Sequence, residues 1–186
     1  GQGIVDLAAL ARLLVASPRP ALVAVQLANN ETGVVQPVAE VARLELAAFF
    51  LSEGLAVEAH GALTLVVEAR PAAISDTDVR LMHGAAAVLL GRSDEAEAGL
   101  TGAAVAATEE GRLWRAIAHA SAGTLDSADA IERIEPSLPL IEAYPKPLRF
   151  AAARPLAEAA LDQGRIEAGE RLIGMLAAAA GPVHAK

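Results

Sequence analysis

The chain of 186 residues contains no cysteine. Disulfide bonds, thiolate metal ligands and cysteine nucleophiles are therefore excluded from its chemistry. Aromatic residues are scarce at 3% of the sequence, although 54% of the residues are hydrophobic. Much of that fraction is alanine, which buries little area per residue, so a core must come from many close helix contacts. The high helix propensity of alanine favours an all-α fold, and we expect the few aromatic side chains to anchor its core.

Positive charge is also in short supply. The 15 basic residues include only Lys146 and Lys186 as lysines, and the formal net charge is −8. The negative excess lies after Leu44, because acidic and basic residues balance before it. Phosphate neutralisation needs clustered cations, so we expect no nucleic-acid partner. Arg-rich, Lys-poor and Ala-rich usage is typical of a bacterial sequence.

Long hydrophobic runs are missing too. A helix that spans a bilayer needs roughly 18–20 apolar residues, and charged residues such as Arg12 and Glu53 interrupt every candidate run. The first residues show no basic segment followed by an apolar one, so we expect no signal peptide. We therefore expect a soluble protein with no membrane partner, cytoplasmic by default.

The first 37 residues mix several kinds of predicted element. Apolar residues at helical spacing predict a helix over 5–16, which the Pro-rich residues 17–20 end. The apolar run 21–27 predicts one short strand, and residues 29–33 (NNETG) have turn chemistry. How this helix and strand pack is left open, and an unpaired edge of strand 21–27 would favour self-association.

Residues 3–44, which include the run LANNETGVVQP, resemble a fragment of the cysteine desulfurases, the pyridoxal-phosphate enzymes of aminotransferase class V. The resemblance implies that Asn30 is cofactor-binding, beside the phenolic oxygen of the ring, where an amide donor stabilises the deprotonated oxygen. The family's His-Val-Asp-x-x-Gln strand, its Ser-x-His-Lys segment and its cysteine are all absent here. We therefore expect no desulfurase chemistry, and we interpret 1–37 as a desulfurase-like fragment joined to another fold.

From Pro37 onward the pattern is helical, and glycines divide it into pairs. Each of four glycines is followed four or five positions later by alanine: Gly54…Ala59, Gly91…Ala96, Gly123…Ala128 and Gly164…Ala168. The predicted helix pairs are 38–52 with 55–70, 77–90 with 93–107, 110–121 with 126–135, and 146–162 with 166–180. A glycine closes each turn, and small residues let the paired helices approach closely.

The glycine spacings of 37, 32 and 41 residues bracket the tetratricopeptide repeat of about 34 residues. Twelve positions before the alanine, where that repeat has a small residue, stand Ala47, Gly84 and Ala116. Residues 38–180 thus resemble a degenerate tetratricopeptide-like (TPR) protein of bacterial type. The resemblance implies a mainly α domain over 38–186, with antiparallel helical hairpins stacked as a short α-solenoid. An irregular helical bundle is the alternative.

Prolines interrupt this pattern in three places. Pro136 and Pro139 cut the second helix of the third pair short, and Pro145 delays the next helix. Pro155 falls inside the predicted helix 146–162, which it should either kink or restart at Leu156.

The sequence shows no catalytic constellation. His60, His83, His119 and His184 include no pair at the i, i+4 spacing of a helical metal site, so we expect no metal site. In the repeat register, His83 and His119 fall on first helices beside an interhelix groove. The numerous carboxylates predict a solvated helix face. The runs 75–78 and 93–95 precede helices, and we expect them to supply N-caps with acids that the helix dipole favours.

We therefore predict a non-enzymatic helical-repeat scaffold that binds an unknown protein or peptide, with no cofactor and no catalytic residues. An inactive desulfurase remnant and a chimera without evolved activity are the alternatives.

Overall fold

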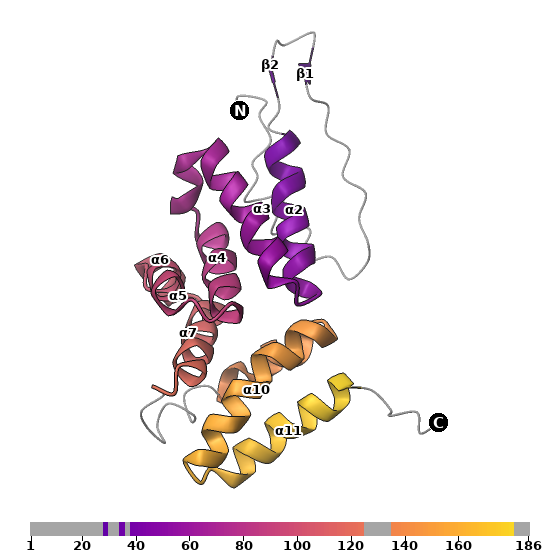
Figure 1. Ribbon diagram of the computed structural model, residues 1–186, viewed down its shortest axis with the longest axis vertical. Helices are drawn as coiled ribbons and strands as arrows, with labels where there is room; N and C mark the ends of the chain where they lie inside the picture. The colour runs from indigo at the N-terminus through magenta and orange to yellow at the C-terminus, as the bar shows by residue number, and fades with distance from the viewer. Residues whose placement is uncertain (1–27, 30–33, 36–37, 125–134, 181–186) are drawn as a thin grey trace, which may run out of the picture.

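The computed structural model describes residues 28–29, 34–35, 38–124 and 135–180, and over these residues the chain is mainly helical (Figure 1). The elements, in chain order, are β1 (Ala28–Asn29), β2 (Val34–Val35), α2 (Val38–Ser52), α3 (Ala56–Ala69), the 3-10 helix η1 (Pro71–Ser75), α4 (Thr77–Leu89), α5 (Ser93–Leu100), α6 (Ala103–Ala107), α7 (Glu109–Ser121), the 3-10 helix η2 (Glu135–Ser137), α9 (Leu138–Ala143), α10 (Lys146–Asp162) and α11 (Ile166–Ala180).

Three of the predicted helix pairs are present as packed neighbours. Helix α2 packs on α3, α4 on α5, and α10 on α11, with α3 and α7 each in contact with α4. Figure 1 shows the α2–α3 pair at one end of the molecule and the α10–α11 pair at the other. The predicted bounds of α2, α10 and α11 match the observed ones to the residue. Of the predicted helix 126–135, residues 126–134 lie outside the described residues.

The predicted turn glycines all adopt the left-handed conformation. Gly54, Gly91, Gly123 and Gly164 have φ between 66° and 73°, which costs an L side chain but not glycine. At each one the glycine N–H donates to the carbonyl three residues back, and the next N–H donates to the carbonyl five residues back. These two hydrogen bonds satisfy the last carbonyls of the preceding helix, so each glycine ends one helix. After Gly54, Gly91 and Gly164 the chain turns directly into the next helix.

The second helix of the second pair is shorter than predicted. It ends at Leu100 instead of running to residue 107, and α6 begins separately at Ala103. Arg80 of α4 explains the break, because its Nη2 donates to the carbonyl of Ala98 at 2.7 Å and its Nε to that of Gly99 at 3.3 Å. The guanidinium also lies against Gly102, so a side chain there would displace it.

Two sequence predictions about local structure are corrected. Helix α10 continues through Pro155, which is buried, so of the two predicted outcomes, a kink or a restart at Leu156, the restart does not occur. Asp76 caps α4 by accepting the backbone N–H of Asp78 at 3.0 Å, as its sequence context predicts. Ser93, in contrast, is the first residue of α5 and not its cap.

Two clusters of buried side chains form the core, and α4 contributes to both. The first lies among α2, α3, η1 and α4, and half of its ten buried members are alanine: Ala47, Ala59, Ala62, Ala73 and Ala86. The second extends from α4 to α11 and contains Trp114, the largest fully buried side chain among the described residues. Alanine is thus frequent in both clusters, since it also supplies eight of the twenty buried members of the second.

Aromatic residues anchor the core only in part. Trp114 is 2% exposed, whereas Phe49 and Phe150 are 55% and 44% exposed. The expectation that all of them are core anchors is therefore wrong for these two phenylalanines.

The amino-terminal predictions fall mostly outside the described residues, including helix 5–16 and strand 21–27. Within the described part, β1 and β2 form an antiparallel pair in which Ala28 faces Val35 and Asn29 faces Val34. The sequence predicted neither strand at these residues, since the predicted strand ends at residue 27 and Asn29 was assigned to the turn 29–33. None of the helices in the described ranges has both the length and the apolar character that a bilayer span requires.

Candidate functional site

A groove lies between α9 and α11. Prolines and one glycine determine where these two helices, its walls, begin and how they are oriented. Pro139 lies at the start of α9 and favours a helix start there, because the N–H that proline lacks would have no acceptor in the first turn of a helix. The chain then stays extended at Tyr144 and Pro145 before α10 begins at Lys146. The turn at Gly164 folds α11 back along α10, which brings α11 opposite α9.

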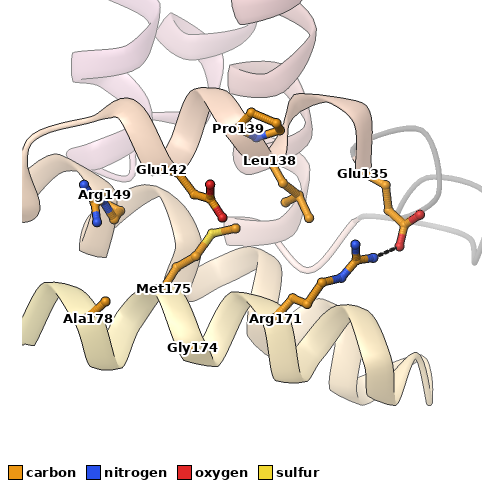
Figure 2. A pocket seen from close by; sticks show the side chains of 9 residues that line it. All are labelled: Glu135, Leu138, Pro139, Glu142, Arg149, Arg171, Gly174, Met175 and Ala178. Carbon is orange, nitrogen blue, oxygen red and sulfur yellow. Dashed lines mark hydrogen bonds and ion pairs between the residues drawn. The ribbon is translucent and has the colours of Figure 1, made fainter.

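The groove has a volume of about 510 Å³ and is lined by nine described residues: Glu135, Leu138, Pro139, Glu142, Arg149, Arg171, Gly174, Met175 and Ala178 (Figure 2). On α9, Leu138 and Glu142 stand four residues apart and share one face. On α11 the four lining residues follow the i, i+3, i+4, i+7 pattern of a single helix face. Two helix faces therefore oppose each other across the groove.

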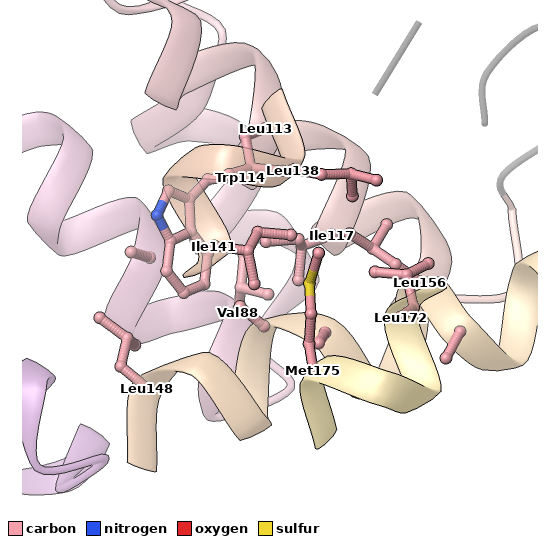
Figure 3. Packing of buried hydrophobic residues seen from close by; sticks show 14 of the residues in the cluster. Val88, Leu113, Trp114, Ile117, Leu138, Ile141, Leu148, Leu156, Leu172 and Met175 are labelled. Carbon is pink, nitrogen blue, oxygen red and sulfur yellow. The ribbon is translucent and has the colours of Figure 1, made fainter. Parts of the chain in front are cut away.

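The floor of the groove is apolar and continuous with the core. Leu138 and Met175 are 6% and 8% exposed, and both belong to the larger core cluster (Figure 3). Pro139, Gly174 and Ala178 are exposed. A side chain that enters the groove would therefore meet apolar atoms below it and charged groups along the rim.

The four charged side chains of the rim differ in their partners. Arg171 donates from Nη2 to Oε1 of Glu135 at one end of the groove. Arg149 donates from Nε and Nη2 to the carbonyl oxygen of Tyr144, at 3.2 Å and 3.0 Å. Glu142 is exposed and makes no ion pair or side-chain hydrogen bond within the described residues.

A polar network fixes the α9–α10 junction to the core. Nε1 of Trp114 donates to the hydroxyl oxygen of Tyr144 at 3.2 Å, and that hydroxyl donates to Oε1 of Glu110 at 2.7 Å. Burial of the Tyr144 hydroxyl, with the negative charge of Glu110 beside it, raises the pKa of Tyr144 far above its usual value. Tyr144 therefore stays protonated and holds the backbone carbonyl that Arg149 binds.

A second cluster of ionisable groups joins α3, α4 and α5. Nε2 of His60 lies 2.8 Å from Oε2 of Glu95, and the ring centroids of His60 and His83 are 4.6 Å apart. Nη1 of Arg92 lies 3.4 Å from the carboxylate of Glu95. Because a carboxylate only accepts, the Nε2 atom of His60 carries the proton in its contact with Glu95.

The surroundings shift the pKa values of two members of this cluster. Burial lowers the pKa of His83, and the positive charge that His60 can carry lowers it further. The hydrogen bond from His60 lowers the pKa of Glu95, and Arg92 adds to that effect. His60, His83 and Glu95 thus link the first hairpin to the second.

The structure brings together only some of the residues that the sequence singled out. Asn30 and His184 lie outside the described residues, so the cofactor role of Asn30 stays a prediction. His119 does not join His60 and His83, and its Nδ1 lies 3.2 Å from Oγ1 of Thr124. Within the described ranges, no group of three or more His, Cys, Asp or Glu side chains could hold a metal ion.

Sequence reasoning missed the groove, the Tyr144 network and the contact between His60 and Glu95. Glu95 and Glu110 were predicted to lie on a solvated helix face, and the structure pairs Glu95 with His60 and Glu110 with Tyr144. A signal for the groove does exist in the one-face spacing of residues 171, 174, 175 and 178, but only the fold shows what that face opposes.

Comparison of the chain with protein-family models, with curated proteins and with solved structures returned no match in any of the three.

Proposed function

We propose that this chain is a non-enzymatic helical scaffold that binds a peptide or an extended segment of another protein, and that this segment lies in the α9–α11 groove. The observation that carries the proposal is a groove of about 510 Å³ with an apolar floor and a charged rim. Peptide sites use the same combination, because apolar contacts supply affinity while a few polar groups fix orientation.

The proposal extends to the architecture, for which we favour TPR-like stacking of helical hairpins over an irregular bundle. Four turns with the same glycine geometry support it, and so does the full burial of Ala47 and Ala59 between α2 and α3. In such arrays each hairpin packs on its neighbours and leaves an extended surface for partners.

The chemistry of the lining supports recognition rather than catalysis. The described residues that line the groove include no serine, threonine, histidine or lysine. The two carboxylates of the rim, on Glu135 and Glu142, are on exposed residues, and neither is held in the buried setting that tunes a catalytic acid.

The test uses glycines that can be substituted without disturbing the fold. Gly174 lies inside the groove and Gly61 on α3, and a Cβ placed on either would meet nothing within 4 Å. Gly174→Leu should fill the groove, while Gly61→Leu makes the same change on a helix that does not line it. Both should keep the wild-type circular dichroism spectrum, because leucine favours helix more than glycine does.

A phage-displayed library of random peptides is selected on the immobilised chain, and the selected peptides are titrated by fluorescence anisotropy. We expect Gly174→Leu to weaken binding by about tenfold or more, and Gly61→Leu to leave it unchanged. The proposal is wrong if no peptide is selected, or if both variants bind the selected peptides as the wild type does.

A further inference from the structure

We propose that the occupant of the groove is a basic, apolar peptide segment that places a lysine or arginine on Glu142 and a neighbouring aliphatic side chain on Leu138 and Met175. This inference rests on the proposed function, because it names the partner chemistry of the same groove.

The partners of the rim charges single out Glu142. Arg171 is paired with Glu135, and Arg149 directs two of its N–H groups at the carbonyl of Tyr144. Glu142 makes no ion pair within the described residues, although it lines the same groove. An incoming cation at Glu142 would form a new ion pair without breaking an existing one. An anion at Arg149 would instead meet a guanidinium that already directs two of its five N–H donors at the carbonyl of Tyr144.

The apolar half of the ligand follows from the residues beside Glu142. Leu138 lies one helical turn before Glu142 on α9, and Met175 faces α9 from α11 (Figure 2). Methionine adapts its shape to different partners because its side chain is unbranched and polarizable. An aliphatic side chain one or two residues from the basic one would therefore lie on Leu138 and Met175 while the cation reaches Glu142.

The charge of the whole chain favours the same class of partner. The net charge of −8 attracts basic segments over several ångströms and raises the rate of encounter at low salt. Since the groove itself carries two arginines and two glutamates, specificity would come from Glu142 rather than from a general negative potential.

The experiment repeats the library selection on three immobilised chains: the wild type, Glu142→Lys and Glu97→Lys. Glu97 is exposed on α5 and does not line the groove, so Glu97→Lys matches the change in net charge. We expect lysine or arginine beside an aliphatic residue in peptides from the wild type and Glu97→Lys. Glu142→Lys should select acidic residues at that position and bind the wild-type peptides about tenfold more weakly.

The outcomes separate this inference from the proposed function. Two outcomes would overturn the inference and leave the groove as a peptide site. In the first, Gly174→Leu weakens binding of the selected peptides, but these peptides show no preference for basic residues. In the second, the basic preference persists in peptides selected on Glu142→Lys. Failure to select any peptide would overturn both. A concentration-dependent dimer of the wild type that Gly174→Leu abolishes would assign the groove to a second copy of the chain, also against the inference.

Discussion

The hairpins α2–α3 and α4–α5 have turns of the same geometry but differ in the residues at which their two helices cross. Gly54 and Gly91 close the two turns with nearly the same φ, 73° and 70°. The first hairpin buries alanines between its helices, at Ala47 and Ala59. The second brings glycine against glycine, so closely that a Cβ placed on Gly99 would lie 2.9 Å from the Cα of Gly84.

This difference separates two roles that small residues have in the chain. The turn glycine sets the direction of the returning helix, and it does so equally well in both hairpins. The crossing residues set how closely the helices approach, because a methyl group keeps two backbones apart where a hydrogen does not. The α4–α5 crossing also lies near the end of α5, which has 8 residues, compared with 14 in α3.

The largest effect should come from Gly99→Ala, which tests the glycine crossing directly. The new methyl group would approach three backbone atoms, the Cα and N of Gly84 and the O of Arg80, at 2.9, 3.1 and 3.3 Å. Backbone atoms cannot rotate away, so the helices must separate, and we expect a loss of about 3 kcal/mol of unfolding free energy. Urea denaturation followed by circular dichroism measures it.

Gly61→Ala, in the other hairpin, is the control for Gly99→Ala. Gly61 is helical and exposed, and its added Cβ would meet nothing within 4 Å. This variant should gain up to about 1 kcal/mol from helix propensity. If Gly99→Ala were as stable as Gly61→Ala, the close approach of α4 and α5 would be wrong.

Ala47→Gly should have the next largest effect, because it introduces a glycine at the crossing that alanine forms. Ala47 is fully buried, so the change removes a buried methyl group, worth about 0.8 kcal/mol, and adds a helix penalty of about 1 kcal/mol. We expect a loss of about 2 kcal/mol in the same denaturation experiment. A gain in stability would show that α2 and α3 approach each other more closely in the variant, and that glycine is the better crossing residue in both hairpins.

Substitutions at the two turns should lower stability by similar amounts, unlike substitutions at the two helix crossings. An L residue at Gly54 or Gly91 must adopt positive φ, so each substitution by alanine should cost about 1.5 kcal/mol. Gly91 has open space around it, and Gly54 has only an ordinary contact with Pro147 at 3.4 Å. Thermal unfolding should therefore rank the two variants together. A difference larger than about 1 kcal/mol would mean that the turns contribute unequally.

The fold could be predicted from sequence wherever a local signal marks an element boundary. Glycine and proline have strong backbone preferences of their own, and that is why the bounds of α2, α10 and α11 and the turn at Gly164 were predicted correctly. The end of α5 at Leu100 depends instead on Arg80 of another helix. The helical pattern through 93–107 carries no trace of that contact.

The candidate site depends almost entirely on tertiary contacts. Glu142 and Met175 are 33 residues apart, and nothing local to either shows that α9 and α11 face each other. The cluster of His60, His83 and Glu95 likewise forms only when α3, α4 and α5 pack against one another. Sequence reasoning placed His83 beside an interhelix groove, but the identity of its neighbours follows only from the packing of α3 on α4.

The smallest predicted effect is the change of stability with pH, and it tests the contact of His60, His83 and Glu95 between the two hairpins. The pKa of His83 is lower in the folded chain than its unfolded value of about 6.5. The unfolded chain therefore takes up a proton first, so stability is full above that pH and falls as the pH drops below it. The lowered pKa of Glu95 adds a second loss as the pH falls below about 4.5. Melting temperature measured against pH should show both steps.

His83→Gln isolates the first step, because it removes the group that titrates and keeps a side chain of similar size on α4 against His60. The melting temperature of this variant should change less than that of the wild type between about pH 7.5 and pH 5.5, while the loss at lower pH remains. His119→Gln removes a histidine outside the cluster and should keep the wild-type profile. If His83→Gln kept the step of the wild type, His83 would not be its source.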